Sequence, residues 1–245
     1  MQSIHNTVRM SGHKPTIVVV PQGAEHQAVL KGLRRVSQQR LDFTPPSVIS
    51  VPIGVEPVRK KLLALHQEHH ISTQDTLLLM GLGGSLVPEL KVGAIAFLDV
   101  CLPDWIDSPT AIESDRSLIK WIDHQLQPSL LHVKGATSQR LVSSAHEKAQ
   151  LHQRLNAAIV DMEGYGLLDF CQHHNIRGGV LRIVSDDCSH DVPDINTAIN
   201  AEGTLETWPM TMAFLQQPIA AVRLIRGALT SLGILETVVV QIFDG

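Results

Sequence analysis

The chain has 245 residues, of which 44% are hydrophobic and 18% are charged. This balance excludes intrinsic disorder, and the length suits one α/β domain, over residues 1–245, that needs no disulfide or metal to be stable. Twenty Lys and Arg residues against 24 Asp and Glu residues give a net charge of −4, and only 4% of residues are aromatic. These values argue against nucleic-acid binding, which relies on basic surfaces and on aromatic side chains that stack on bases.

The cysteines and the apolar runs indicate a cellular location. Cys101, Cys171 and Cys188 are far apart and form no CxxC pair, which predicts buried thiols in a reducing compartment. The first 15 residues lack the apolar core of a secretory signal, and the run TLLLMGLGGSLV is too short and glycine-rich to span a bilayer. We therefore expect a soluble, cytoplasmic protein with no membrane span.

The first half of the chain alternates between short apolar runs and amphipathic segments. Apolar runs bounded by Pro and Gly are typical of buried strands, and apolar residues at helical spacing indicate helices. In chain order we expect a strand at 16–20, a helix at 24–36, a strand at 47–54, a helix at 58–69, and strands at 76–81 and 94–100.

The second half continues this alternation. We expect a helix at 115–127, a strand at 130–135, a helix at 144–154 capped by Ser143 or Ser144, a strand at 157–163, a helix at 164–174, a strand at 179–186 and a helix at 218–232. The last apolar run, TVVVQIF at 237–243, suggests a sheet edge or an interface. The alternation predicts a single three-layer αβα domain with a mostly parallel, mixed central sheet.

In such sheets ligands bind where the strands end, so residues at strand ends are the candidates for chemistry. The run Gly81–Ser85 follows one predicted strand, and its glycines allow a ligand to approach the backbone closely. It is neither a P-loop nor a GxGxxG motif, and a simple tight turn is the alternative.

Two other strand ends carry carboxylates. In Asp161-Met162-Glu163 the strand alternation places the two acids on one side and the methionine on the other. Such carboxylates can accept hydrogen bonds from sugar hydroxyls, whereas capping of the following helix is the alternative. Next to Ser185, Asp186 ends another strand, where desolvation would raise the pKa of its carboxyl and allow it to donate a proton; a turn is again the alternative.

Metal and serine-hydrolase chemistry are disfavoured. The histidines at 66, 69, 70, 173 and 174 form no HExxH motif, and no GxSxG sequence is present. We expect no metal site.

The order of three motifs points to a family. The runs GLGGSLVPELKVG (81–93), VDMEG (160–164) and LRIVSDD (181–187) together resemble the purine nucleoside phosphorylase and methylthioadenosine/S-adenosylhomocysteine nucleosidase superfamily. TIVVV followed by PQGAEHQAVLKGL is similar to that family's first strand and helix. The runs at 143–164 and 214–229 most resemble the hopanoid-associated phosphorylase-like (adenosylhopane nucleosidase) branch, whose members release adenine from an adenosylated lipid precursor.

This resemblance implies cleavage of the N-glycosidic bond of a purine nucleoside, with adenine as the base and a substituent at the 5′ position. It implies that Asp186 protonates purine N7 and that Glu163 binds ribose hydroxyls. Glu25 is the candidate for positioning water, with His26 as its rival. The remaining substrate-binding candidates are Met162, which would pack against the sugar, Ser185, and Gly83 and Gly84, which would line the side of the nucleophile.

Two departures from the family pattern bear on the nucleophile. The segment 19–23 lacks the arginine of the phosphorylases' phosphate motif, and Leu82 stands where many members have serine. Loss of a cation and a hydroxyl weakens a phosphate site, so we expect water as the nucleophile. The alternatives are a phosphorylase with inorganic phosphate as co-substrate, and a nucleoside-binding protein without catalysis.

The resemblance also implies that no cofactor is needed, that the partner is a small purine nucleoside, and that the chain forms a homo-oligomer, from dimer to hexamer. The aromatic residue that stacks on the purine is not identified by position. Trp105, Phe170 and Trp208 are the candidates.

Overall fold

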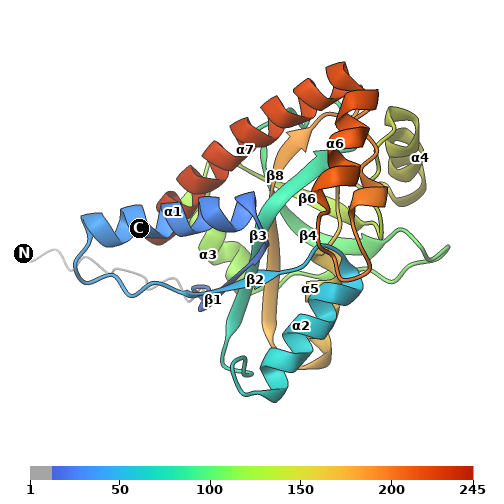
Figure 1. Ribbon diagram of the computed structural model, residues 1–245. Helices are drawn as coiled ribbons and strands as arrows, with labels where there is room; N and C mark the ends of the chain where they lie inside the picture. Colours follow the sequence, from blue (N-terminus) through green and yellow to red (C-terminus); the bar gives the residue numbers. More distant parts are fainter. Residues whose placement is uncertain (1–12, 245) are drawn as a thin grey trace, which may run out of the picture.

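The computed structural model describes residues 13–244 (Figure 1). The strands are β1 (Ile17–Pro21), β2 (Ser47–Val51), β3 (Thr76–Ser85), β4 (Ile95–Pro103), β5 (Ile112–Glu113), β6 (Leu130–Thr137), β7 (Ile159–Asp161) and β8 (Arg177–Asp186). The helices are α1 (Ala24–Gln39), α2 (Val55–Gln67), α3 (Arg116–Leu126), α4 (Ala145–Leu155), α5 (Gly164–His173), the 3-10 turn η1 (Asn196–Ala198), α6 (Thr207–Gln216) and α7 (Pro218–Asp244).

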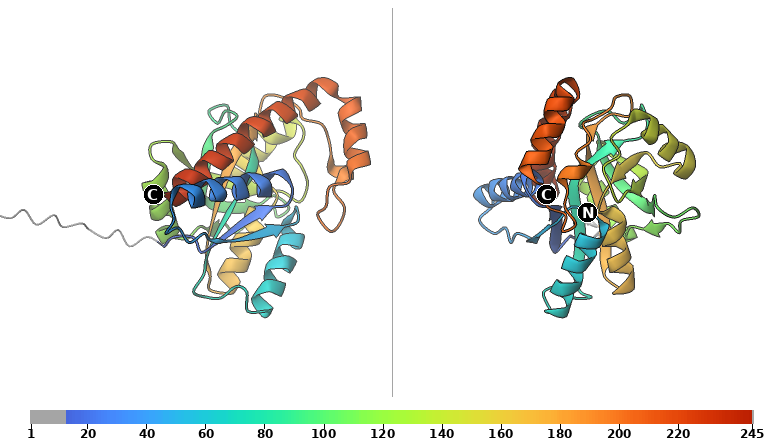
Figure 2. Two further views of the ribbon diagram at one scale, coloured as in Figure 1. Left: turned by 60° about the vertical axis from the view of Figure 1, so that its left-hand side comes forward. Right: turned by 45° about the vertical axis from the view of Figure 1, so that its right-hand side comes forward.

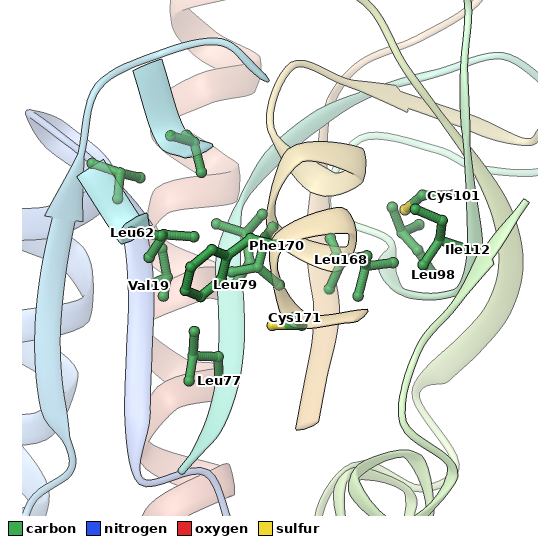
Figure 3. Packing of buried hydrophobic residues seen from close by; sticks show 14 of the residues in the cluster. Val19, Leu62, Leu77, Leu79, Leu98, Cys101, Ile112, Leu168, Phe170 and Cys171 are labelled. Atoms are coloured by element: carbon green, nitrogen blue, oxygen red, sulfur yellow. The ribbon is translucent and has the colours of Figure 1, made fainter. Parts of the chain in front are cut away.

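The sheet is covered on both faces, which confirms the predicted three-layer α/β fold with a mixed central sheet (Figures 1 and 2). Successive side chains of a strand point to opposite faces, so a strand buried on both faces is an unbroken apolar run. In β3, Leu77 and Leu79 pack towards α2 and α5, as Figure 3 shows, while Leu78 and Met80 pack towards α1, α3 and α7.

Strand β3 closes the sheet on itself. Its first part pairs in parallel with β1 and β8, and its last two residues, Gly84 and Ser85, pair antiparallel with β7. Strand β8 also pairs with β4, β4 with β6, and β6 with β7, which completes a ring of strands. The register shifts at Gly83/Gly84, where β3 leaves its regular pairing with β8. The ring therefore brings the ends of β3, β7 and β8 to one place.

The C-terminal apolar run is helical, so its interpretation as a sheet edge is wrong. Residues 237–243 complete α7, and Val238, Val239, Ile242 and Phe243 are buried at helical spacing. A Cβ atom on Gly32 of α1 would lie 2.7 Å from Val239, so the two helices are in close contact. This tertiary packing overrides the strand propensity of the valines.

Other elements differ from the expectations. Strand β7 is shorter than predicted, because Asp161 already accepts a hydrogen bond from the amide of Gly164 at the start of α5, at 2.9 Å. Strand β5, η1 and α6 were not predicted. Ser144 is the N-cap of α4. The cysteines are free thiols; Cys101 and Cys171 are buried and Cys188 is half-buried.

Helix α7 is longer than the apolar run at 76–87, which is too short to span a bilayer. By length and composition alone α7 could cross a membrane. In its most apolar 18-residue stretch, 22% is buried inside the protein. Its second half packs against α1 and α3 in the core, so that half is part of the domain.

A histidine between two aspartates links the stability of the fold to pH. His132 contacts Asp99 through Nδ1 and Asp123 through Nε2, each at 2.7 Å. Partial burial acts to lower the pKa of His132, but the hydrogen bonds and charges of the two carboxylates outweigh it, so the pKa is raised.

We expect the wild type to be more stable than His132→Gln, and the difference to depend on pH. The stabilisation that protonated His132 contributes is fully present below the pKa of the histidine in the unfolded chain, ~6.5. It is lost as the pH rises through the higher pKa of His132 in the folded protein. Because solvent screens these partly exposed side chains, the difference in the free energy of unfolding is limited to ~1 kcal/mol. Urea unfolding between mildly acidic and alkaline pH measures it, with His146→Gln on the exposed face of α4 as control. A difference that grows with pH would contradict this account.

Candidate active site

A cavity of about 430 Å³ lies where β3, β7 and β8 end. The candidates from the sequence that line it are Glu25, Gly83, Gly84, Met162, Glu163, Ser185 and Asp186. His26 does not line it, so of the two rivals the structure brings Glu25 to the cavity. The opposite wall is apolar and contains Leu205, Met210, Phe214, Leu224 and Ile225, mostly from α6 and α7.

Arg182 lies beneath the polar side of the cavity and is fully buried. Its Nε and Nη2 donate to Asp161 Oδ2 at 2.9 and 2.6 Å, and Nη2 also donates to Glu163 Oε2 at 2.9 Å. The amide of Gly54 donates to the other oxygen of Glu163 at 3.2 Å. A buried charge requires such partners, and here the pairing fixes the orientation of Glu163. Asp161 and Glu163 both pair with Arg182, although β7 ends at Asp161 and the strand alternation does not extend to Glu163.

The remaining guanidinium nitrogen of Arg182 faces Glu25. Nη1 is buried and has no hydrogen-bond partner within residues 13–244. A Cβ atom on Gly81 would lie 2.4 Å from this Nη1 and 2.6 Å from Glu25 Oε1, so only glycine leaves room for both groups. Glu25 Oε1 accepts a hydrogen bond from the amide of Leu82 at 2.7 Å. An unsatisfied donor and a carboxylate are thus placed side by side.

Burial controls the protonation of the two glutamates. It raises the pKa of Glu25 to about 7, with a further contribution from the charge of Glu163, and against the effects of the Leu82 amide and Arg182. Burial also raises the pKa of Glu163, and Arg182 opposes that rise. A carboxyl that titrates near neutral pH is suited to exchanging a proton with a bound molecule.

Asp186 is held at both of its oxygens. Ser185 Oγ donates to Oδ1 at 2.8 Å, and the ammonium group of Lys148 pairs with Oδ2. Lys148 comes from α4, is fully buried, and also donates to the carbonyl of Asp187 at 2.7 Å. A Cβ atom on Gly84 would lie 2.8 Å from Oδ2, so this glycine lets the carboxylate lie against β3. The alternative of a simple turn does not account for this buried pair.

Sequence reasoning missed both buried cations. Arg182 interrupts a strand that is otherwise apolar, and Lys148 shares a helix face with the buried Leu151 and Leu155 at i+3 and i+7. A charged residue on a face that is otherwise buried is the signal that was available, since such residues are almost never fully buried unless paired. The site therefore contains more positive charge than the sequence suggested.

The three aromatic candidates lie outside the cavity. Trp105 packs edge-on against Tyr165 at 5.7 Å, Phe170 belongs to the core beside α2, and Trp208 is 74% exposed. Within the described part of the chain, the aromatic residue that lines the cavity is Phe214 of α6, an element that was not predicted.

The structure places Arg140 on the cavity wall, where its guanidinium forms an ion pair with Glu147 at 2.7 Å. In residues 13–244 no group of three or more His, Cys, Asp or Glu side chains is arranged to hold a metal ion.

Comparison with known proteins agrees with this architecture. The family model described as the phosphorylase superfamily matches residues 19–208. No curated protein matches the chain in sequence. Futalosine hydrolase of Helicobacter pylori has the same fold at 19% identity, with a TM-score of 0.64 over 91% of this chain and 96% of that one. The 5′-methylthioadenosine/S-adenosyl homocysteine nucleosidase of Campylobacter jejuni is similar at 16% identity, with a TM-score of 0.65 over 95% and 99%.

The family match covers all three motifs and most of the cavity's lining residues. The chain belongs to the phosphorylase superfamily and is an enzyme of the nucleosidase or phosphorylase type, a class that needs no cofactor.

Proposed function

We propose that this enzyme hydrolyses the N-glycosidic bond of a purine nucleoside, with adenine as the leaving base and water as the nucleophile. The observation that carries the proposal is one cavity lined by three carboxyl groups in different surroundings: Glu25, Glu163 and Asp186. Cleavage of this bond needs three actions, which are binding of the ribose, protonation of the base and delivery of the nucleophile, and each carboxyl group suits one of them.

Glu163 is the group that binds the ribose. Its carboxylate is oriented by Arg182 and the Gly54 amide, and it faces the cavity beside Met162. Hydrogen bonds to sugar hydroxyls strengthen as positive charge develops on the sugar in an oxocarbenium-like transition state. Met162 supplies an adaptable apolar surface for the sugar ring.

Asp186 is the group that protonates the base at N7. In the ligand-free site Asp186 is a carboxylate paired with the buried ammonium of Lys148, so it takes up a proton from water as the nucleoside binds. When it passes that proton to N7 it returns to the carboxylate that Lys148 stabilises. Ser185 holds the other oxygen and so fixes the direction of the carboxyl group. Lys148 is in this scheme a positioning residue that acts through Asp186.

Glu25 is the group that handles water. A carboxylate with a pKa of about 7 accepts a proton efficiently near neutral pH. The Nη1 of Arg182 beside it is buried and does not line the cavity, so Arg182 acts on Glu25 through its charge, which limits the rise of the pKa of Glu25. The resulting hydroxide attacks C1′ as the base departs.

Water is favoured over phosphate by charge. Two of the nitrogens of Arg182 are already occupied by Asp161 and Glu163, so a phosphate ion there would meet Glu25 and Glu163 with little positive charge to spare. Arg140 on the cavity wall is the observation that keeps a phosphorylase as the second candidate. A nucleoside-binding protein without catalysis is the remaining alternative.

The apolar wall formed by Leu205, Met210, Phe214, Leu224 and Ile225 supports an apolar substituent on the 5′ position. The resemblance of residues 143–164 and 214–229 to the hopanoid-associated branch supports the same substrate class. The family resemblance also favours a homo-oligomer in the cytoplasm.

The reaction itself is the first test. Incubation with adenosine or 5′-methylthioadenosine should release free adenine at the same rate with and without inorganic phosphate, and chromatography should show free ribose or its 5′ derivative. Strict dependence on phosphate, with a ribose 1-phosphate product, would establish the phosphorylase instead. Tight nucleoside binding without product would establish the binding protein.

Glu25→Gln should lower kcat/KM for adenine release by about 10²–10⁴-fold, because the amide cannot accept a proton from water. In the wild type kcat/KM should fall as the pH drops below about 7, because Glu25 becomes protonated. The matched control is His26→Gln, which changes the neighbouring side chain outside the cavity and should leave the rate and the pH profile almost unchanged. A similar loss in both variants would argue against this role for Glu25.

Asp186→Asn should reduce adenine release by about 10²–10⁴-fold, because the amide cannot protonate N7. The same variant should retain far more activity on p-nitrophenyl riboside, whose leaving group needs no proton. Asp187→Asn is the control, since Asp187 pairs with the exposed His190. An equal loss on both substrates would point to damage to the fold rather than to loss of an acid.

A further inference from the structure

Helix α6 is mostly apolar and yet has no buried residue. Its sequence, TWPMTMAFLQ, contains no charged side chain. Met210 and Phe214 line the active-site cavity, while Trp208, Met212 and Leu215, at i, i+4 and i+7, form an exposed face on the other side. Neighbouring large apolar side chains on a soluble protein are rarely left exposed, so this side of α6 is expected to have a partner.

The first half of α7 extends this exposed face. Ile219, Val222 and Leu229 are exposed along one side of the helix, with Ile219 at 78% and Leu229 at 65%. Arg226 falls on the same side, at the spacing of one helix face. In Figures 1 and 2, α6 and this half of α7 form an outer corner of the molecule, away from α1 and α2. We call these exposed residues of the two helices the outer face.

A groove of about 670 Å³ runs along the same half of α7. Its lining is apolar apart from Thr230 and two cations, Arg223 and Arg226. Arg223 also contacts the carbonyl of Asp191 at 3.5 Å. Across the groove lies Val92, whose neighbour Lys91 is exposed. An apolar groove with cations along it is suited to an acyl chain and an anionic head group.

The charges distinguish between possible occupants. Residues 207–235 contain Arg223 and Arg226 and no Asp or Glu, although the whole chain carries a charge of −4. In a symmetric contact between two copies, the same surface meets itself, so the arginines of each copy would face a segment with no carboxylate to pair with. The charge pattern therefore favours a partner that is apolar and negatively charged.

We propose that the outer face docks on the surface of an anionic lipid bilayer. The exposed Trp208 fits such a boundary, since its ring is apolar and its N–H is polar. The docking is peripheral, because the second half of α7, including Leu235, Val239 and Phe243, is buried in the core and cannot leave it without exposing α1. Leu205 and Ile225 are exposed and also line the cavity, so the cavity rim would lie close to the bilayer.

Co-sedimentation with vesicles tests this inference without reference to catalysis. The wild type should sediment with vesicles of phosphatidylcholine mixed with phosphatidylglycerol, and far less with phosphatidylcholine alone. The double variant Ile219→Glu/Leu229→Glu should lower the partition coefficient about tenfold or more, because it replaces apolar contacts with charges that anionic lipids repel. Arg226→Gln should weaken binding about fivefold, and added salt should reduce the wild type's binding in the same direction.

Two controls separate this result from a general effect of the substitutions. Leu41→Glu and Arg116→Gln alter an exposed leucine and an exposed arginine elsewhere and should leave the partition coefficient unchanged. Ile219 and Leu229 do not line the cavity, so release of base from a soluble nucleoside should be the same in the double variant as in the wild type.

The proposal is overturned if the wild type binds neither kind of vesicle, or binds both equally, or if the double variant binds as well as the wild type. Analytical ultracentrifugation identifies the competing occupant. A wild-type oligomer that the double variant converts to monomers, with no binding to vesicles, would show that the outer face is a contact between copies.

Discussion

The buried guanidinium of Arg182 is the interaction on which the site depends. A charge without solvent must be compensated, and Arg182 is compensated by Asp161 at the end of β7 and by Glu163 at the start of α5. Because Arg182 belongs to β8, these ion pairs join two strands and a helix at the point where a ligand would bind. Removing the arginine would leave two acids buried without a counter-charge, which is far more costly than losing one hydrogen bond. The same side chain directs its remaining N–H towards Glu25.

The closed ring of strands makes this arrangement possible. An open parallel sheet would leave the ends of β3 and β7 apart, whereas the turn of β3 at Gly83 and Gly84 pairs it with β7. Glycine matters here for space: a side chain at 81 would collide with Arg182 and Glu25, and one at 84 would collide with Asp186. The glycine-rich run thus lets charged groups lie against the backbone.

The cavity has two walls of opposite character. Charged groups fixed by strand ends line one side, and the apolar side chains of α6 and α7 line the other. The strand side is held rigidly by hydrogen bonds and ion pairs, while α6 contributes no buried residue and makes few contacts with the rest of the domain. We propose that catalysis takes place at the charged wall and that the apolar wall recognises the 5′ substituent. The outer face of the same two helices is where we infer contact with lipid.

The sequence by itself determined the alternation of strands and helices, the αβα layers and the strand-end motifs, because strands buried on both faces must be apolar runs and because turn residues mark where they end. The strand-end pattern also gave Glu163 and Asp186 as candidates, and the family resemblance added Glu25 in the first turn of α1; all three line the cavity. Only the tertiary structure decided that residues 237–243 are helical, since packing against Gly32 outweighs the β propensity of the valines. It alone brought Arg182 and Lys148 to the carboxylates, and placed Phe214 rather than Trp105, Phe170 or Trp208 at the cavity. Local patterns record which face of an element is buried, but the partner of a buried charge is a long-range contact that no local pattern contains.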